Sequence, residues 1–217
     1  MKHPLFDHVL FINLESRKDR FEHVIMELNK LELPNEYQRF PGIYVEGNGT
    51  LGCALSHLQC LEIAKERNYP FVFICEDDIT FLQPHILLEN VQKFWDESLI
   101  AGWDVLIISG NNYFPFEEIN EYLIRVHCCA TTTGYIIANH YYDTLINNFK
   151  ESVYYLTQSP NYKEQYAIDV NWRNLQKEHK WYMIIPPTVT QYSNYSNIEN
   201  NDVDYDTAIL NYKKPYV

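Results

Sequence analysis

The sequence predicts an α/β fold in which helices flank one mostly parallel, Rossmann-like sheet. Short apolar runs, typical of buried strands, alternate with longer segments whose apolar residues recur at helical spacing. Such strand–helix–strand alternation favours parallel pairing in a doubly wound sheet. The length of 217 residues fits one domain of this kind. We therefore expect a single domain over 1–217.

The first half of the chain contains predicted strands and helices in regular alternation. Ser16 is the expected cap of the first helix, the second helix is expected to begin near Thr50, and Pro84 is expected to open the third. The expected strands of this half cover 9–14, 37–43, 71–76 and 104–110.

After residue 110 the pattern is less regular. Residues 123–128 and 134–138 are predicted strands that could run antiparallel, and 181–185 is a predicted last strand. Residues 141–149 and 167–178 have helical spacing. The polar segment 191–206 is predicted to be a loop or lid.

Composition excludes several classes of function. The chain has 17 Lys+Arg against 29 Asp+Glu, for a net charge of -12. This balance disfavours non-specific binding to nucleic acid or anionic lipid. The first eight residues lack the apolar core of a signal peptide, and no apolar stretch approaches the roughly 20 residues of a membrane span. We therefore expect a soluble, cytoplasmic protein.

The cysteines support a reducing compartment. Their number is odd and none forms a Cys-x-x-Cys pair, so we expect free thiols instead of disulfides or zinc ligands. The five cysteines are Cys53, Cys60, Cys75, Cys128 and Cys129.

Three consecutive acids, Glu76, Asp77 and Asp78, follow the apolar run at 71–75. Open α/β sheets bind ligands at the carboxyl ends of their strands, and adjacent carboxylates repel unless a cation lies between them. Mg²⁺ and Mn²⁺ prefer carboxylate oxygens and leave positions open for phosphates. Because side chains alternate along an extended chain, Glu76 and Asp78 should face one way and Asp77 the other. For the triplet alone, a solvated turn is the alternative.

Two further segments carry polar side chains near predicted strand and helix ends. Asn13, Arg17 and Arg20 follow the first strand. Residues 49–57 combine glycines with Thr50, Ser56 and His57 where the second helix begins. Such a helix start offers free backbone N–H groups. Taken alone, the glycines are weak evidence, and a histidine such as His57 is more often a structural residue with its hydrogen bonds satisfied.

In this order and spacing, these three segments resemble glycosyltransferase family 25. That family includes bacterial lipooligosaccharide galactosyltransferases and animal procollagen galactosyltransferases. The resemblance covers most of the chain, because later stretches at 103–106, 133–137, 166–169 and 187–191 also follow the family pattern. The three segments that carry it are Ile12–Arg20, Gly49–His57 and Glu76–Asp78.

The resemblance implies a GT-A architecture, with a nucleotide-sugar-binding half over about 1–110 and an acceptor half with a C-terminal loop over about 111–217. It implies metal-dependent, inverting transfer of a hexose, galactose or glucose, from a UDP-sugar to a glycan or protein hydroxyl. Mn²⁺, or alternatively Mg²⁺, would offset the charge that grows on the leaving diphosphate. A general base would assist the attacking hydroxyl.

The resemblance also assigns roles to residues. Asp78 and Glu76 are the expected metal ligands, and Asp169 is the expected base, with a structural role on its helix as the alternative. Donor-binding roles extend over the nucleobase, the ribose and diphosphate, and the sugar, and Arg20 could instead brace the first loop. The expected donor-binding residues are Asn13, Leu14, Arg17, Arg20, Thr50, Gly52, Ser56, His57, Asp77 and Gln191.

Two other functions fit parts of the sequence. A glycosyltransferase-like module that binds a UDP-sugar without turnover would share the same donor segments. A receiver-like phosphoryl-transfer domain could use the acid triplet. Receiver domains, however, place acids directly after the first strand, where this chain has Asn13 and Leu14 before Glu15.

Overall fold

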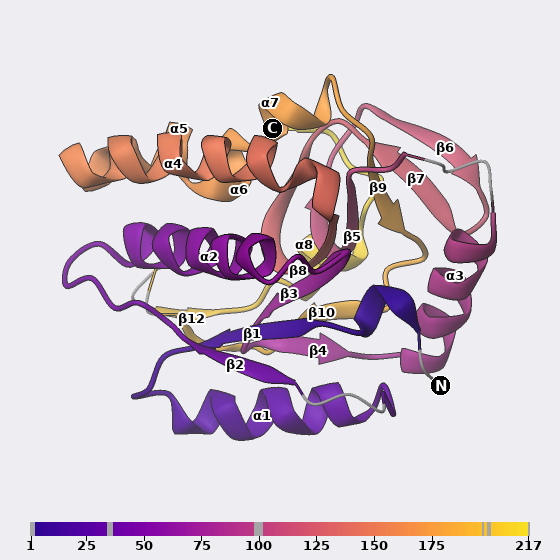
Figure 1. The fold of residues 1–217 in the computed structure, drawn as a ribbon, viewed down its shortest axis with the longest axis horizontal. Helices are drawn as coiled ribbons and strands as arrows, with labels where there is room; N and C mark the ends of the chain where they lie inside the picture. Colours follow the sequence, from indigo (N-terminus) through magenta and orange to yellow (C-terminus); the bar gives the residue numbers. More distant parts are fainter. Residues whose placement is uncertain (1–2, 34–36, 98–101, 197, 199–200, 217) are drawn as a thin grey trace.

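One eight-stranded mixed sheet forms the centre of the molecule (Figure 1). The computed structural model describes residues 3–33, 37–97, 102–196, 198 and 201–216. The strand order is β2-β1-β3-β8-β5-β9-β7-β6. Strands β2, β1 and β3 are mutually parallel, as are β5 and β9, so the prediction of a mostly parallel sheet is confirmed. The bounds are β1 (Val9–Asn13), β2 (Gln38–Pro41), β3 (Phe71–Glu76), β5 (Val105–Asn112), β6 (Phe116–Asn120), β7 (Leu123–Val126), β8 (Cys129–Ala138) and β9 (Trp181–Ile184).

Strand β8 separates the two parallel groups. It pairs antiparallel with β3 on one side and with β5 on the other. The antiparallel arrangement considered for 134–138 is therefore confirmed. The strand is longer than predicted, and its first residues pair with the end of β5, where Asn111 and Asn112 lie opposite Ala130 and Cys129.

Helices cover both faces of the sheet. Figure 1 shows α2 (Gly49–Glu66) and α4 (Tyr142–Gln158) side by side on one face and α1 (Lys18–Asn29) on the other. Apolar residues of α3 (Pro84–Asp96) pack in the same cluster as those of α1. Shorter elements are α5 (Lys163–Tyr166), α6 (Ile168–Asn171), α7 (Arg173–Gln176), α8 (Asp206–Leu210) and the 3-10 helices η1 (Pro4–Phe6), η3 (Asn139–Tyr141) and η4 (Pro160–Tyr162).

The buried strands have apolar residues on both faces, which explains their continuous apolar runs. Leu10 and Ile74 join the cluster under α2 and α4, whereas their neighbours Phe11 and Phe73 join the cluster with α1 and α3. This alternation follows from the period of two residues along a strand.

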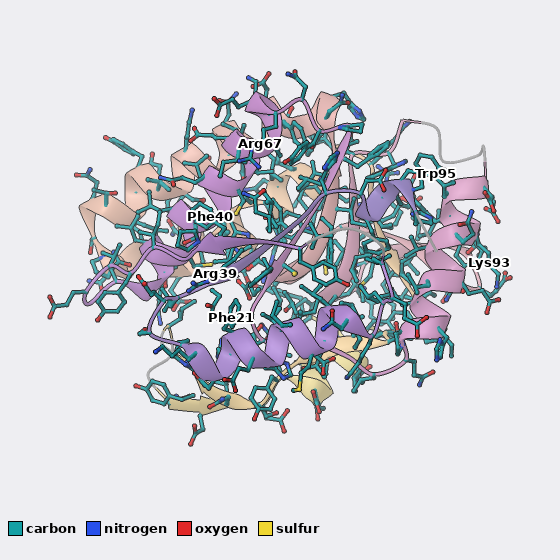
Figure 2. All side chains as sticks on the ribbon, turned by 60° about the horizontal axis from the view of Figure 1, so that its bottom comes forward. Phe21, Arg39, Phe40, Arg67, Lys93 and Trp95 are labelled. Atoms are coloured by element: carbon teal, nitrogen blue, oxygen red, sulfur yellow. The ribbon has the colours of Figure 1, made fainter. Side chains whose placement is uncertain are left out.

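The first helix begins later than predicted. Arg17, and not Ser16, occupies the cap position of α1, and its side chain makes no cap hydrogen bond. The backbone N–H of Arg17 instead closes a turn on the carbonyl of Leu14 at 3.0 Å, and this turn delays the helix. Figure 2 shows Arg39 of β2 beside Phe21 of α1, with the guanidinium 5.4 Å from the ring centroid.

The polar C-terminal segment is more ordered than a loop. Strands β11 (Asn194–Ser196) and β12 (Asn201–Val203) pair antiparallel into a hairpin, called here the C-terminal hairpin. Just before it, β10 (Val189–Gln191) pairs with β4 (Ile79–Phe81). The prediction of a loop or lid over 191–206 therefore missed this pairing, because backbone pairing here needs no apolar face.

Two features of the structure bear on the expectations drawn from composition. All five cysteines are free thiols. Within the described ranges, no helix combines the length and apolarity needed to cross a bilayer.

Candidate active site

The three acids lie at the carboxyl end of β3, as predicted. Glu76 is the last residue of the strand, and Asp77 and Asp78 form the turn that leads into β4. Ile12 of β1 is in register with Glu76, so Asn13 at the end of β1 lies next to the acids. Asp77 and Asp78 are buried, which makes their charges costly unless they are paired.

Arg20 of α1 joins two of the acids. Its Nη1 donates to Asp77 Oδ1 at 3.1 Å and to Asp78 Oδ2 at 3.0 Å. Asn13 Nδ2 donates to the other oxygen of Asp77 at 2.7 Å. Both carboxylates thus have donors, but one guanidinium carries only one positive charge for two buried acids.

Glu76 faces the opposite side, toward α2 and β8. Its Oε1 accepts from Thr132 Oγ1 at 2.8 Å and lies 3.2 Å from His57 Nε2. The other ring nitrogen of His57 lies 2.7 Å from the hydroxyl of Tyr135. His57 is fully buried, so this chain of hydrogen bonds fixes its ring.

The predicted alternation of the acids is only partly correct. Asp77 was expected to face away from Asp78, yet both contact Arg20. The strand ends at Glu76, so the strict alternation of an extended chain stops there. Glu76 and Asp78 nevertheless converge, because Gln191 Nε2 lies 3.5 Å from Glu76 Oε2 and 3.4 Å from Asp78 Oδ1.

The three carboxyls differ in their pKa values. Burial raises the pKa of Glu76. The hydrogen bond and charge of His57, the hydrogen bond of Thr132 and the charge of Arg20 lower it by more, so the pKa of Glu76 lies below its ordinary value. Burial and the nearby acids raise the pKa of Asp77 in spite of Arg20. Burial first, and the charge of Glu76 second, raise the pKa of Asp78 to about 8. Arg20 alone therefore cannot neutralise all three carboxylates, and without a metal Asp78 takes up a proton instead.

The raised pKa of Asp78 predicts how stability depends on pH when no metal is bound. The carboxyl keeps its proton in the folded state up to about pH 8 but loses it near 3.8 when unfolded. Its contribution to the free energy of unfolding is full below about pH 4 and is lost as the pH rises to about 8. Melting curves of the wild type and Asp78→Asn in a chelator should therefore diverge over this range, with the variant gaining relative stability as pH rises. A difference that is constant with pH would contradict the shift.

Two arginines hold the C-terminal hairpin near the acids. Arg17 Nη1 and Arg20 Nη2 both donate to the carbonyl of Tyr195, at 3.0 Å and 3.1 Å. The backbone N–H of Tyr192 donates to the carbonyl of Asp78 at 2.6 Å. Arg17 and Arg20 thus both hold the hairpin, and Arg20 holds the acids as well.

Ser56, an expected donor residue on α2, instead braces a neighbouring loop. Ser56 accepts from the backbone N–H of Ile43 at 2.8 Å and donates to the carbonyl of Gly52 at 2.7 Å. Leu14 and Thr50 are half-buried, and in the described part of the chain the Thr50 side chain makes no hydrogen bond. Contact of these four residues with a donor stays a prediction.

Gly52 permits the close approach of this loop to α2. A Cβ added at Gly52 would lie 2.4 Å from the carbonyl oxygen of Ile43, which is backbone and cannot rotate away. Gly52→Ala is therefore expected to lower the free energy of unfolding by about 1–3 kcal/mol, measured by urea denaturation. Gln59→Ala, on the exposed face of the same helix, is the control and should be close to neutral. Equal stability of the two variants would show that the loop can move at little cost.

Asp169, the predicted base, lies beside the acids but does not contact them. Its Oδ2 accepts from the backbone N–H of Thr131 at 3.0 Å. Thr131 has a φ of 76°, so this bond supports an unfavourable backbone conformation. The next residue, Thr132, donates to Glu76, which places Asp169 one residue along β8 from the acid cluster. Burial raises the pKa of Asp169.

Two sets of side chains near β3 could hold a metal ion. Cys53, His57 and Glu76 offer ligand atoms within 4.8 Å of one another. Burial, followed by the charge of Glu76, raises the pKa of the Cys53 thiol well above its usual value, which disfavours the thiolate that a metal needs. The carboxylate oxygens of Glu76 and Asp78 that approach the amide of Gln191 form the second set, and they suit a hard cation better.

Thr132 and Tyr135 are the site residues that sequence reasoning missed. Both hold the ring–carboxylate pair of His57 and Glu76 in place. A signal was present, because three threonines precede Gly134 in a strand that is otherwise apolar. Polar side chains within a buried strand need partners, so their clustering indicates a polar site beneath.

Comparison with known proteins identifies the family to which this chain is similar. The profile of glycosyltransferase family 25 (LPS biosynthesis protein) matches residues 47–169, more than half of the chain. A glycosyltransferase 25 family member from Anopheles gambiae is 26% identical over an alignment of 161 residues, and the alignment covers 60% of this chain and 27% of that protein. The chain therefore spans about a quarter of the length of this relative.

Two solved structures are more remotely similar. A mannose-1-phosphate geranyltransferase from Thermus thermophilus aligns with a TM-score of 0.46 and 10% identity, over 83% of this chain and 73% of that one. A Drosophila beta-1,4-galactosyltransferase 7 in complex with manganese, UDP-Gal and xylobiose aligns with a TM-score of 0.37 and 10% identity, over 64% and 52%.

Proposed function

This chain belongs to glycosyltransferase family 25, and we propose that it transfers a hexose from a UDP-sugar to a hydroxyl of a glycan or protein. Galactose and glucose are the proposed sugars, and inversion at the anomeric carbon is the proposed outcome. Family membership, and the position of the acids at the carboxyl end of β3, support this reaction class.

The observation that carries the proposal is the convergence of Glu76, Asp78 and Gln191. All three side chains are at most partly exposed, and both carboxylates approach the same nitrogen of Gln191. Gln191 Oε1 is buried and has no hydrogen-bond partner in the structure. A buried amide oxygen next to surplus carboxylate charge is suited to a cation.

A divalent cation would be held by Asp78 and Glu76, with the amide oxygen of Gln191 as a third donor. Mn²⁺ is the proposed ion, with Mg²⁺ as the alternative. When bound, the ion would supply charge to offset that of the leaving diphosphate. Arg20 would remain to pair with Asp77, and His57 with Thr132 would keep Glu76 ionised and oriented.

Asp169 is the proposed general base for the acceptor hydroxyl. Burial raises its pKa toward the range in which a carboxylate accepts a proton well. The bond from Thr131 holds one of its oxygens, and the second remains for the hydroxyl. Asn13, Leu14 and Arg17 would bind the nucleobase side, the start of α2 the ribose and diphosphate, and Asp77 the sugar hydroxyls.

Calorimetric titration of UDP tests the metal-dependent donor site. We expect UDP to bind in the presence of Mn²⁺ and to lose at least about tenfold in affinity in a chelator, because the diphosphate would then face uncompensated acids. Gln191→Ala should weaken the Mn²⁺-dependent part of the affinity. UDP binding of equal strength with and without the ion would count against the proposal.

One observation favours a non-catalytic module that only binds the donor. Arg20 already donates to Asp78 and partly neutralises it without a metal. Hydrolysis of UDP-galactose or UDP-glucose to free UDP with Mn²⁺ distinguishes the two functions. Slow release of UDP supports the transferase, whereas UDP binding with no hydrolysis or transfer across a panel of donors supports the module.

A further inference from the structure

A groove of about 1010 Å³ lies outside the acid cluster, between the chain around Phe116 and helices α6 and α7. Aromatic side chains, Arg173 and Val170 line it, and Tyr216 near the C-terminal end closes one wall. We refer to it as the aromatic groove. It is large enough for a saccharide of more than one unit.

The aromatic groove has a flat apolar wall. The rings of Phe114 and Phe116 are stacked, with centroids 4.9 Å apart and planes at 17°. Phe114 is 49% exposed and Tyr216 is 61% exposed. Exposed aromatic rings in a recess indicate a binding surface, and a flat ring pair matches the flat C–H face of a sugar ring.

Arg173 brings a positive charge into the groove, and the charge of Asp169 is near enough to interact with it without forming a close ion pair. Its guanidinium lies 5.1 Å from the ring centroid of Tyr216 and 5.9 Å from that of Tyr113. Its Nε is buried without a hydrogen-bond partner, and among the described residues no carboxylate pairs with it within 4.0 Å. A partly desolvated guanidinium of this kind favours a carboxylate or phosphate.

The acids of the groove do not supply that anion. Glu117 accepts from His127 at 2.9 Å and from Arg125 at 3.4 Å, so it is already satisfied. Glu164 is exposed, and Lys177 adds a second positive charge to the lining. The charged side chains that line the groove therefore do not share the acidic excess of the whole chain, whose net charge is -12.

The groove adjoins the proposed base. Val170, which lines it, directly follows Asp169, and Arg173 is one helical turn further on. Asp169 in turn contacts Thr131, whose neighbour Thr132 contacts Glu76. The groove therefore lies next to the segment of α6 that carries Asp169.

We propose that the aromatic groove binds the acceptor, and that this acceptor is an anionic saccharide. A sugar face would lie on Phe114 and Phe116, and a carboxylate or phosphate would pair with Arg173. The assignment rests on the proposed function for its meaning, since it names the substrate that receives the hexose. Binding itself needs neither donor nor metal, so it can be measured separately.

The test uses matched pairs of sugars in which one member carries an anionic group that the other lacks. Ligand-observed NMR would measure binding of 4-nitrophenyl β-D-glucuronide against 4-nitrophenyl β-D-glucoside, and of glucose 6-phosphate against glucose. We expect one anionic sugar to bind about tenfold to a hundredfold more tightly than its neutral partner, from a hydrogen-bonded charge pair. The pair that shows the preference identifies carboxylate or phosphate as the recognised group. No preference in either pair overturns the proposal.

Single substitutions identify the side chains that cause the preference for anionic sugars. Arg173→Gln should abolish the preference for the anionic sugar, whereas Phe114→Ala should weaken the charged and neutral sugars alike. Arg67→Gln, the same change at an exposed arginine that pairs with Gln38 and Tyr69, is the control and should leave binding unchanged. A preference that survives Arg173→Gln would also overturn the proposal. Loss of metal-dependent UDP binding, by contrast, would overturn the proposed function and leave this result standing.

Discussion

Asp78→Asn is expected to lower hexose transfer at least about 1000-fold, the largest loss for any single change in this chain. The substitution keeps the shape of the side chain but removes the charge through which Asp78 would hold the cation. Without the ion, the surplus charge on the leaving diphosphate would face Glu76 directly. Transfer and hydrolysis can both be followed as released UDP at saturating Mn²⁺.

The structure predicts that this variant stays folded. Asp78 is a buried acid whose pKa is raised to about 8, so its charged form opposes folding. Asp78→Asn should therefore melt at the same temperature as the wild type or higher at neutral pH without metal. Asp143→Asn, an exposed acid that pairs with Lys65, is the control and should retain full turnover. Retained turnover by Asp78→Asn would remove Asp78 from its proposed role.

Asp169→Asn is expected to lower transfer about 100-fold to 10,000-fold, the range that a general base contributes. An asparagine oxygen can still accept the hydrogen bond from the backbone of Thr131, so the unfavourable φ of that residue stays supported. UDP affinity with Mn²⁺ should not change, because Asp169 lies outside the acid cluster. The measurements are released UDP with acceptor present, and UDP titration.

The pH dependence separates a base from a structural residue. A base gives the wild type an acidic limb in its rate profile, and Asp169→Asn should lack that limb. Asp169→Ala also loses the bond to Thr131 and should cost a further 1–3 kcal/mol, roughly, in the free energy of unfolding. If Asp169→Asn keeps the wild-type rate and only Asp169→Ala loses it, the role of Asp169 is structural.

The sequence predicted the strands and helices of the first half well, because their signals are local. Runs such as 71–76 and 104–110 are apolar on both faces, and both form central strands. The position of β8 between these strands could not be predicted, because an apolar strand does not encode its neighbours. The pairing depends on contacts between residues far apart in sequence, such as Ile74 with Tyr135.

The candidate site was predictable where a short motif contains it. Glu76, Asp77 and Asp78 lie where the motif and the strand end indicated, and Asn13, Arg20, His57 and Gln191 join them through hydrogen bonds. Which of these side chains face a ligand and which only support the fold was not predictable. Whether Ser56 faces a ligand or a backbone N–H depends on the path of the loop at Ile43, which helical spacing does not specify.

Arg20 links the acids to the C-terminal hairpin, because it donates to both Asp78 and the carbonyl of Tyr195. One guanidinium serves both partners, so the free energies of its two contacts are coupled, and the coupling is reciprocal. A cation that competes with Arg20 for Asp78 would also change the contact of Arg20 with the hairpin. The susceptibility of the hairpin to proteolysis would then depend on whether the acids hold a cation. Limited proteolysis of the hairpin would therefore report occupancy of the cation site.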